Sequence, residues 1–205
     1  MIWLDTPHDL TAFLQKHAHA THIGMDTEFI RERTYFPQLA LVQLVIDEEI
    51  VLVDASIPAV AQALKPMLEN PAVLKIMHSC SEDLQAFKAG CDAVPSPVFD
   101  TQVAAALCSL GGSLSYLKLV EQLCAVTLEK GETRSDWLQR PLTESQKHYA
   151  ADDVRYLLPM YKDLQQRLEA LGRLDWLDAD CAFAVDSARN EQADANPHLG
   201  VRSNQ

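Results

Sequence analysis

Two carboxylates stand two residues apart at the end of an apolar run. The run is "HIGMDTEF", residues 22–29, and the carboxylates are Asp26 and Glu28. In a strand, residues two apart point to the same face, so both acids share one face while Met25 and Thr27 point to the other. Like charges this close repel unless a proton, a basic partner or a metal ion neutralises them. Carboxylates are the natural ligands of Mg²⁺ and Mn²⁺, although an isolated pair is more often a strand running out into solvent.

Two other places combine acids with neighbours that suit catalysis. Glu82 and Asp83 follow an apolar strand at the start of an expected helix, where sites of α/β folds usually lie, although a helix N-terminus favours acids anyway. Tyr149 and Asp153 are four apart and therefore share a helix face, with Asp152 as an alternative. A hydroxyl beside a carboxylate can position a water molecule. An amphipathic helix with a packed tyrosine and a solvated acid explains the same spacing.

The elements that must position these residues are strands early in the chain and helices later. We expect strands at residues 1–5, 22–29, 39–46, 48–55 and 72–79, and helices at 6–18, 57–70, 81–90, 101–112, 113–126, 143–172 and about 174–189. The strands at 39–46 and 48–55 form a hairpin, and Pro159 bends the longest helix. This order predicts an α/β fold in which helices cover a sheet.

Composition sets the limits of the architecture. The chain has 205 residues, of which 48% are hydrophobic, which suits one domain with a tail. We expect residues 1–190 to form the domain and 191–205 to be a linker or disordered tail. No apolar run is long enough to span a membrane, and the start does not read as a signal peptide. The five scattered cysteines form no C-x-x-C pair, so we expect reduced thiols in a cytoplasmic protein and no zinc site.

The formal charge of −12 argues against a nucleic-acid partner, because phosphates would be repelled. The objection weakens if the acids are concentrated where they hold divalent cations.

Five segments, in this order, resemble one known family. They are "DTEF" (26–29), "RERTYFPQLALVQL" (31–44), "HSCSEDLQAF" (78–87), "VFDTQ" (98–102) and "RSDWLQRPLTESQKHYAADDVRYLLPMY" (134–161). Together they closely resemble ribonuclease D, a 3′→5′ exoribonuclease family of the DEDD superfamily, in the subclass whose third motif is Y-x-x-x-D. The resemblance covers about residues 1–190. The combination is specific, whereas a lone D-x-E is not.

The resemblance implies a ribonuclease H-like exonuclease fold with a central mixed sheet flanked by helices. It implies two divalent metal ions, Mg²⁺ with Mn²⁺ also active. Asp26 would contact both ions, Glu28 and Asp153 would hold the ion that carries the attacking water, and Asp83 would serve the other. Tyr149 would orient the water. The implied catalytic residues are thus Asp26, Glu28, Asp83, Tyr149 and Asp153, with Asp153 preferred over Asp152.

The implied reaction releases 5′-nucleoside monophosphates from single-stranded 3′ ends of RNA, such as tRNA precursors or other structured RNAs. We expect a monomer with no membrane partner and no small-molecule cofactor. The expected substrate contacts are Thr27, Phe29, His78 and Arg134. Packing explains Phe29 and His78 as well, and Arg140 is a second candidate for the RNA backbone. Gln43 points its polar side outward and receives no role.

Other functions fit parts of the pattern. The same metal site serves DNA proofreading exonucleases, and only a contact to the ribose 2′-OH would separate RNA from DNA. A binding module that no longer cuts would typically lose a ligand, whereas all five motif residues are present. A haloacid-dehalogenase-type phosphatase needs D-x-D and a following Thr, which "DTEF" does not provide. The family usually carries helical domains after the nuclease, so we expect this chain to be truncated.

Overall fold

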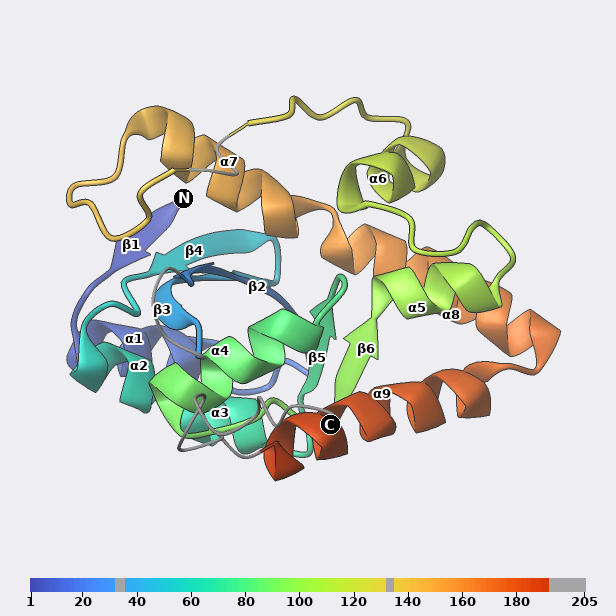
Figure 1. Cartoon of the computed structure of the whole chain (residues 1–205), viewed down its shortest axis with the longest axis horizontal. Coiled ribbons are helices and arrows are strands. Elements are labelled where there is room, and N and C mark those ends of the chain that lie inside the picture. Colours follow the sequence, from blue (N-terminus) through green and yellow to red (C-terminus); the bar gives the residue numbers. More distant parts are fainter. Residues whose placement is uncertain (32–35, 132–134, 192–205) are drawn as a thin grey trace, which may run out of the picture.

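The computed structural model describes residues 1–31, 36–131 and 135–191. Its six strands are β1 (Ile2–Leu4), β2 (His22–Ile30), β3 (Gln38–Ile46), β4 (Glu49–Val53), β5 (Leu74–Met77) and β6 (Val98–Asp100). The helices are α1 (Pro7–Lys16), α2 (Pro58–Ala63), α3 (Lys65–Glu69), α4 (Ser81–Cys91), α5 (Thr101–Leu107), α6 (Tyr116–Cys124), α7 (Glu144–Arg155), α8 (Leu157–Leu171) and α9 (Leu174–Asn190). Figure 1 shows the strands at the centre with helices around them. The expected α/β fold is confirmed.

The strands form one mixed sheet in the order β1-β4-β3-β2-β5-β6. β3 runs antiparallel to both of its neighbours, and the other pairs are parallel. β3 and β4 form the expected hairpin, whose turn places Asp47 and Glu48 at positive φ, as tight hairpin turns require. After Gln38, every residue of β3 is buried, which explains its nearly continuous apolar sequence.

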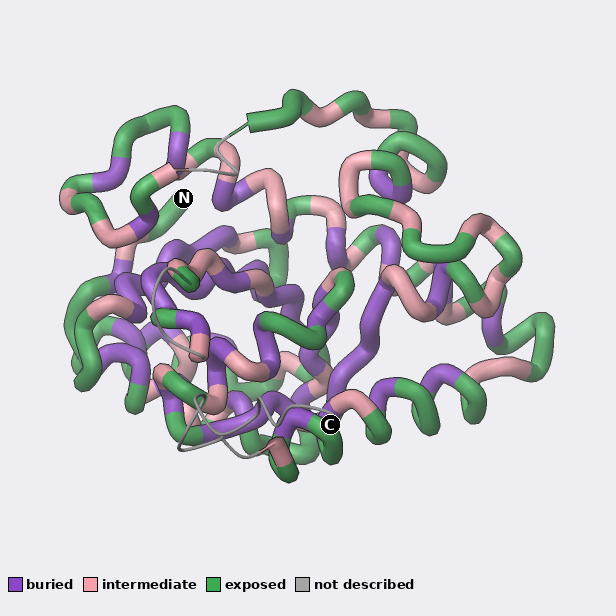
Figure 2. The backbone as a smooth tube through the Cα atoms, viewed as in Figure 1, coloured by how far each residue is buried: buried purple, intermediate pink, exposed green. Residues whose placement is uncertain are grey.

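Two layers of helices cover the sheet. The helices α1 to α4 share one apolar core with its first face, and α5 to α8 pack over the other. The strand β3 is buried after Gln38, while buried and exposed residues alternate along α9 (Figure 2). In the described part of the chain, no helix combines the length and apolar character needed to cross a bilayer.

Two expected helices are each broken in two shortly before a proline. The helix predicted at 57–70 is α2 and α3, separated at Leu64, and Pro66 lies in the first turn of α3. The helix predicted at 143–172 is α7 and α8, separated at Tyr156 rather than bent at Pro159. Proline lacks an N–H, and its ring collides with the carbonyl four residues earlier, so the break falls before the proline and not at it.

The sequence analysis missed one strand and overestimated the length of two helices. The strand β6 was not predicted, because its three residues are too few to show periodicity. The helices predicted at 101–112 and 113–126 are shorter, ending at Leu107 and beginning at Tyr116. Ser115 caps the second one by accepting from the Lys118 N–H.

Candidate active site

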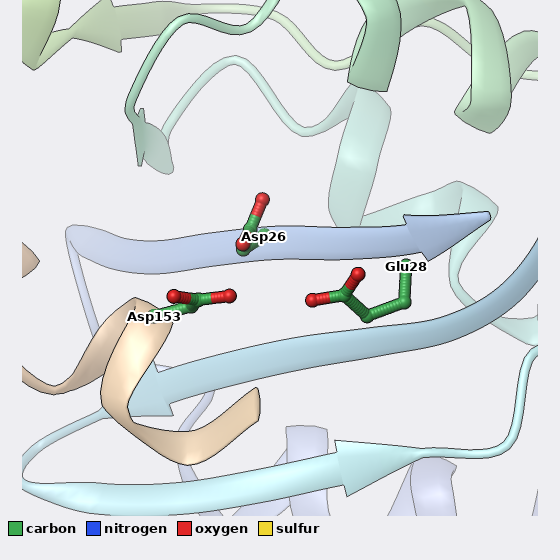
Figure 3. Close-up of side chains that lie close together, drawn as sticks. All are labelled: Asp26, Glu28 and Asp153. Atoms are coloured by element: carbon green, nitrogen blue, oxygen red, sulfur yellow. The ribbon is translucent and has the colours of Figure 1, made fainter. Parts of the chain in front are cut away.

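Asp26 and Glu28 lie on β2, just beyond the point where its pairing with the neighbouring strand β5 ends. The pairing of β2 with β5 extends from His22 to Gly24, while the pairing with β3 continues past both acids. Asp153 comes from the last turn of α7, which crosses the same face of the sheet. The three residues each offer a carboxylate oxygen, and these atoms lie within 4.8 Å of one another. Figure 3 shows the carboxylates of Glu28 and Asp153 facing each other below the strand that carries Asp26.

Burial and mutual repulsion oppose ionisation of this cluster. Removal from water raises the pKa of Asp26 well above its ordinary value, and the nearby charges of Asp83, Asp153 and Glu28 add to the rise. Burial, followed by the charge of Asp153, likewise raises the pKa of Glu28. Burial raises the pKa of Asp153 to about 7. Without a cation, such a cluster retains protons near neutral pH, which is the electrostatic condition that a divalent cation relieves.

Asp83 lies beside this cluster rather than within it. It is buried in the first turn of α4, and its carboxylate accepts a hydrogen bond from the hydroxyl of Thr27. Burial raises its pKa to about 7. The neighbouring Glu82 is exposed. Of the two neighbouring acids Glu82 and Asp83, only Asp83 therefore faces the site.

The two neighbouring acids of the Y-x-x-x-D segment, Asp152 and Asp153, also have different surroundings. Asp153 joins the cluster, whereas Asp152 pairs with Arg155 at 3.1 Å. Tyr149 lies one helical turn before Asp153, and its ring centroid is 6.0 Å from that of Trp137. A Cβ on Gly131 would stand 2.9 Å from the Tyr149 ring, so the loop passes closely over the ring because that residue is glycine. A cavity of about 270 Å³, lined by Tyr149 and Asp153 among others, opens at this place.

α7, which carries both residues, is fixed at its start. Thr143 and Gln146 form a capping box, in which each side chain bonds the other's backbone N–H. Just before the helix, Arg140 donates to Asp54 at 2.8 Å and to the backbone carbonyls of Ala40 and Trp137. These contacts hold Arg140 against the protein, and its contact with the RNA backbone stays a prediction.

The sequence interpretation of Gln43 was wrong. The residue lies on β3 directly opposite Asp26, is fully buried, and donates from Nε2 to Glu28 Oε1 at 3.2 Å. Its Oε1 has no hydrogen-bond partner among the described residues. A single polar residue in the otherwise apolar strand "LALVQLVI" was the signal for this contact.

The predicted substrate contacts have differing environments. The His78 Nε2 donates to the Leu114 carbonyl at 2.9 Å, since a carbonyl only accepts. Burial lowers the pKa of His78, so the ring is neutral and its Nδ1 accepts from the Thr101 hydroxyl at 2.8 Å. Both ring nitrogens are thus bonded within the protein. Phe29 packs partly buried against the core.

Arg134 lies outside the described residues. The Thr27 hydroxyl is bonded to Asp83. Contacts of all four residues with substrate stay predictions.

The comparisons with known proteins agree with this geometry. Residues 1–169 match the family model of a 3′–5′ exonuclease domain. A ribonuclease D of Xanthomonas oryzae pv. oryzae is 49% identical over 99% of this chain and 56% of its own length. The crystal structure of Escherichia coli RNase D, described as an exoribonuclease involved in structured RNA processing, superposes with a TM-score of 0.87 at 38% identity, covering 93% of this chain and 51% of that one.

Brucella melitensis NrnC with bound Mg²⁺ has a TM-score of 0.77 at 24% identity, over 95% of this chain and 96% of that one, which shows a shared fold alone. The chain spans about half the length of the curated relatives that it matches. The resemblance to ribonuclease D is confirmed.

Proposed function

The chain belongs to the 3′–5′ exonuclease family, and we propose that it removes nucleotides from the 3′ end of RNA by hydrolysis that requires two divalent metal ions. The observation that carries the proposal is the cluster of Asp26, Glu28 and Asp153, with Asp83 beside it. Four carboxylates form an all-oxygen donor set, which suits Mg²⁺ or Mn²⁺ better than softer metals. Their raised pKa values indicate a site that is destabilised without cations.

Each residue has a proposed task. When bound, the ions lower the pKa of the attacking water, neutralise the scissile phosphate and stabilise the leaving 3′ oxyanion. Asp26, which lies between the other acids, would contact both ions, with Glu28 and Asp153 on one side and Asp83 on the other. Tyr149 would orient the attacking water from the helical turn before Asp153. The buried amide of Gln43 would hold Glu28 in place.

The substrate is proposed from the relatives. The named relatives are ribonucleases D, and the superposed Escherichia coli enzyme is described as acting in structured RNA processing. We therefore propose single-stranded 3′ ends of RNA, with tRNA precursors as the first candidates and 5′-nucleoside monophosphates as products. With a net charge of −12, the chain is expected to contact only a few nucleotides at the frayed 3′ end and not to bind a long stretch of RNA.

Domain and location are proposed on separate grounds. We propose residues 1–190 as the catalytic domain, supported by the packing of α9 against α4 and β6 up to Asn190. The five cysteines are all free in the structure, which supports a reducing compartment such as the cytoplasm. The monomeric state stays a prediction that sedimentation would measure.

A gel assay on labelled oligonucleotides tests the function. A 5′-labelled single-stranded RNA and a DNA of the same sequence are incubated with Mg²⁺, Mn²⁺ or EDTA. We expect a ladder that shortens from the 3′ end, that EDTA abolishes, and that is stronger on RNA. A ladder stronger on DNA would favour the DNA exonuclease, and binding without cleavage would favour a module that no longer cuts.

A further inference from the structure

We propose that Asp100 is a positioning residue that fixes Asp83 in the active site by holding the turn between β5 and α4. The inference rests on the proposed function, because Asp83 matters there as a metal ligand. Asp100 belongs to the "VFDTQ" segment, to which neither the sequence nor the proposed mechanism assigns a role. It ends β6, and its Cα pairs with Met77 at the end of β5.

The Asp100 carboxylate receives three backbone N–H groups. Oδ1 accepts from Ser79 at 2.9 Å and from Gln102 at 2.9 Å, and Oδ2 accepts from Cys80 at 3.0 Å. The Gln102 contact makes Asp100 the N-cap of α5. The other two contacts bind the turn that leads into α4. One buried side chain therefore sets the beginnings of two helices.

That turn depends on an external partner. Ser79 has φ 55°, a left-handed conformation that a residue other than glycine adopts at a cost. Cys80 is the N-cap of α4 but makes no side-chain cap hydrogen bond. Cap residues are usually Ser, Thr, Asp or Asn, so this helix start lacks its ordinary stabilisation. Asp100 supplies, from the next strand, the acceptor that the turn itself does not contain.

Thr101 reinforces the same connection. Its hydroxyl lies 3.2 Å from the Met77 carbonyl and 2.8 Å from His78 Nδ1. The three successive residues 78–80 are thus hydrogen-bonded to Asp100 and Thr101 of the "VFDTQ" segment, and Met77 pairs with Asp100 in the sheet. Asp83 follows this stretch by a single turn of helix, and the Cys80 carbonyl accepts the first α4 hydrogen bond, from Leu84. A shift of the turn would move Asp83 away from Thr27.

A nearly isosteric variant separates this role from a general loss of packing. In Asp100→Asn the amide oxygen can replace only one carboxylate oxygen, so the NH₂ group meets a backbone N–H of the turn or of α5. Thr6→Ala is the matched control, because it removes a single cap acceptor, for the Asp9 N–H of α1, far from the acids. Both variants are made in the full chain.

Two readouts are compared with wild type. The first is hydrogen exchange of the amides of residues 79–84 in metal-free protein without RNA, which reports the turn whether or not the chain cuts. The second is the Mn²⁺ concentration that gives half-maximal binding, followed by electron paramagnetic resonance. We expect Asp100→Asn to speed exchange in this stretch at least tenfold and to raise the Mn²⁺ concentration about tenfold, the size found when partners of metal ligands are removed.

We expect Thr6→Ala to change neither readout. Unchanged exchange at 79–84 in Asp100→Asn would overturn the inference even if the wild type cuts RNA. Faster exchange at residues 79–84 would show that Asp100 holds the turn even if the RNA assay detects no cleavage. The role of Asp100 and the exonuclease function can therefore fail separately.

Discussion

The hydroxyl of Thr27 donates a hydrogen bond to the carboxylate of Asp83, which joins β2 to α4 across 56 positions of sequence. Asp26 and Glu28 flank Thr27 in the chain but point to the opposite face of the strand, toward α7. Asp26 and Glu28 meet Asp153. Thr27, between them in the chain, holds Asp83, whose charge adds more to the rise in the Asp26 pKa than any other neighbouring charge.

The first prediction concerns this contact. Thr27→Val keeps the shape and strand preference of the side chain but leaves the buried Asp83 carboxylate without the hydroxyl. We expect a roughly tenfold rise in the Mn²⁺ concentration for half-maximal cleavage. Thr27→Ser, which keeps the hydroxyl, should behave like wild type. Equal metal dependence in Val and Ser variants would show that the hydrogen bond has no role.

A second prediction concerns Gln43, whose amide donates to Glu28 while its carbonyl oxygen has no partner in the described part of the chain. Gln43→Met has similar length and no polar amide. Cleavage should fall about tenfold because Glu28 loses its orienting donor. The melting temperature should stay the same or rise, because an unpaired buried oxygen is removed. A clear fall in melting temperature with unchanged cleavage would make Gln43 a packing residue only.

The third prediction is a pH dependence of stability in metal-free protein. Asp83 and Asp153 have folded pKa values of about 7, raised from 3.8, so the folded state holds protons that the unfolded state has released. Their contribution is fully present below about pH 4 and is lost as pH rises through about 7.

Melting in EDTA between pH 5.5 and pH 8 measures this loss. The melting temperature of wild type should fall over this interval, more steeply than that of Asp153→Asn, which lacks one of the two groups. Mn²⁺ should stabilise wild type more at pH 8 than at pH 5.5, because protons and cations compete for the same oxygens. Parallel curves for wild type and Asp153→Asn would show that Asp153 does not hold such a proton in the folded state.

A fourth prediction concerns the ion pair that fixes the segment before α7. Asp54 is buried, with its side chain 7% exposed, and Arg140 donates to it at 2.8 Å. Arg140→Met leaves that charge unpaired and should destabilise the fold by about 3 kcal/mol or more in urea unfolding. Adding Asp54→Leu should restore most of the loss. A double variant no more stable than the single one would place the cost in the lost carbonyl contacts of Arg140 instead.

The sequence predicted which face of β2 carries Asp26 and Glu28, because side chains alternate strictly along a strand. The alternation of side chains in β2 correctly put Asp26 and Glu28 on one face and Thr27 on the other. The choices of Asp83 over Glu82 and Asp153 over Asp152 came from the resemblance. Spacing alone did not decide which acid of each pair faces the site, because adjacent residues at a helix end both lie within one turn of the other site residues.

Contacts between segments distant in sequence escaped prediction. Gln43 was interpreted as outward-facing because a polar residue in a strand usually faces solvent, yet both faces of β3 are covered. β6 has too few residues for a periodic signal, and Asp100 at its end bonds a turn 20 positions earlier. Such pairs follow from the order of strands in the sheet, which a single sequence does not specify.

Anomalous diffraction from crystals soaked in Mn²⁺ with a short RNA measures whether Asp26 and Glu28 of β2, Asp83 of α4 and Asp153 of α7 hold two metal ions. We expect two Mn²⁺ peaks, one in contact with Asp26, Glu28 and Asp153 and the other between Asp26 and Asp83. Saturating Mn²⁺ with no peak at these four residues would contradict it.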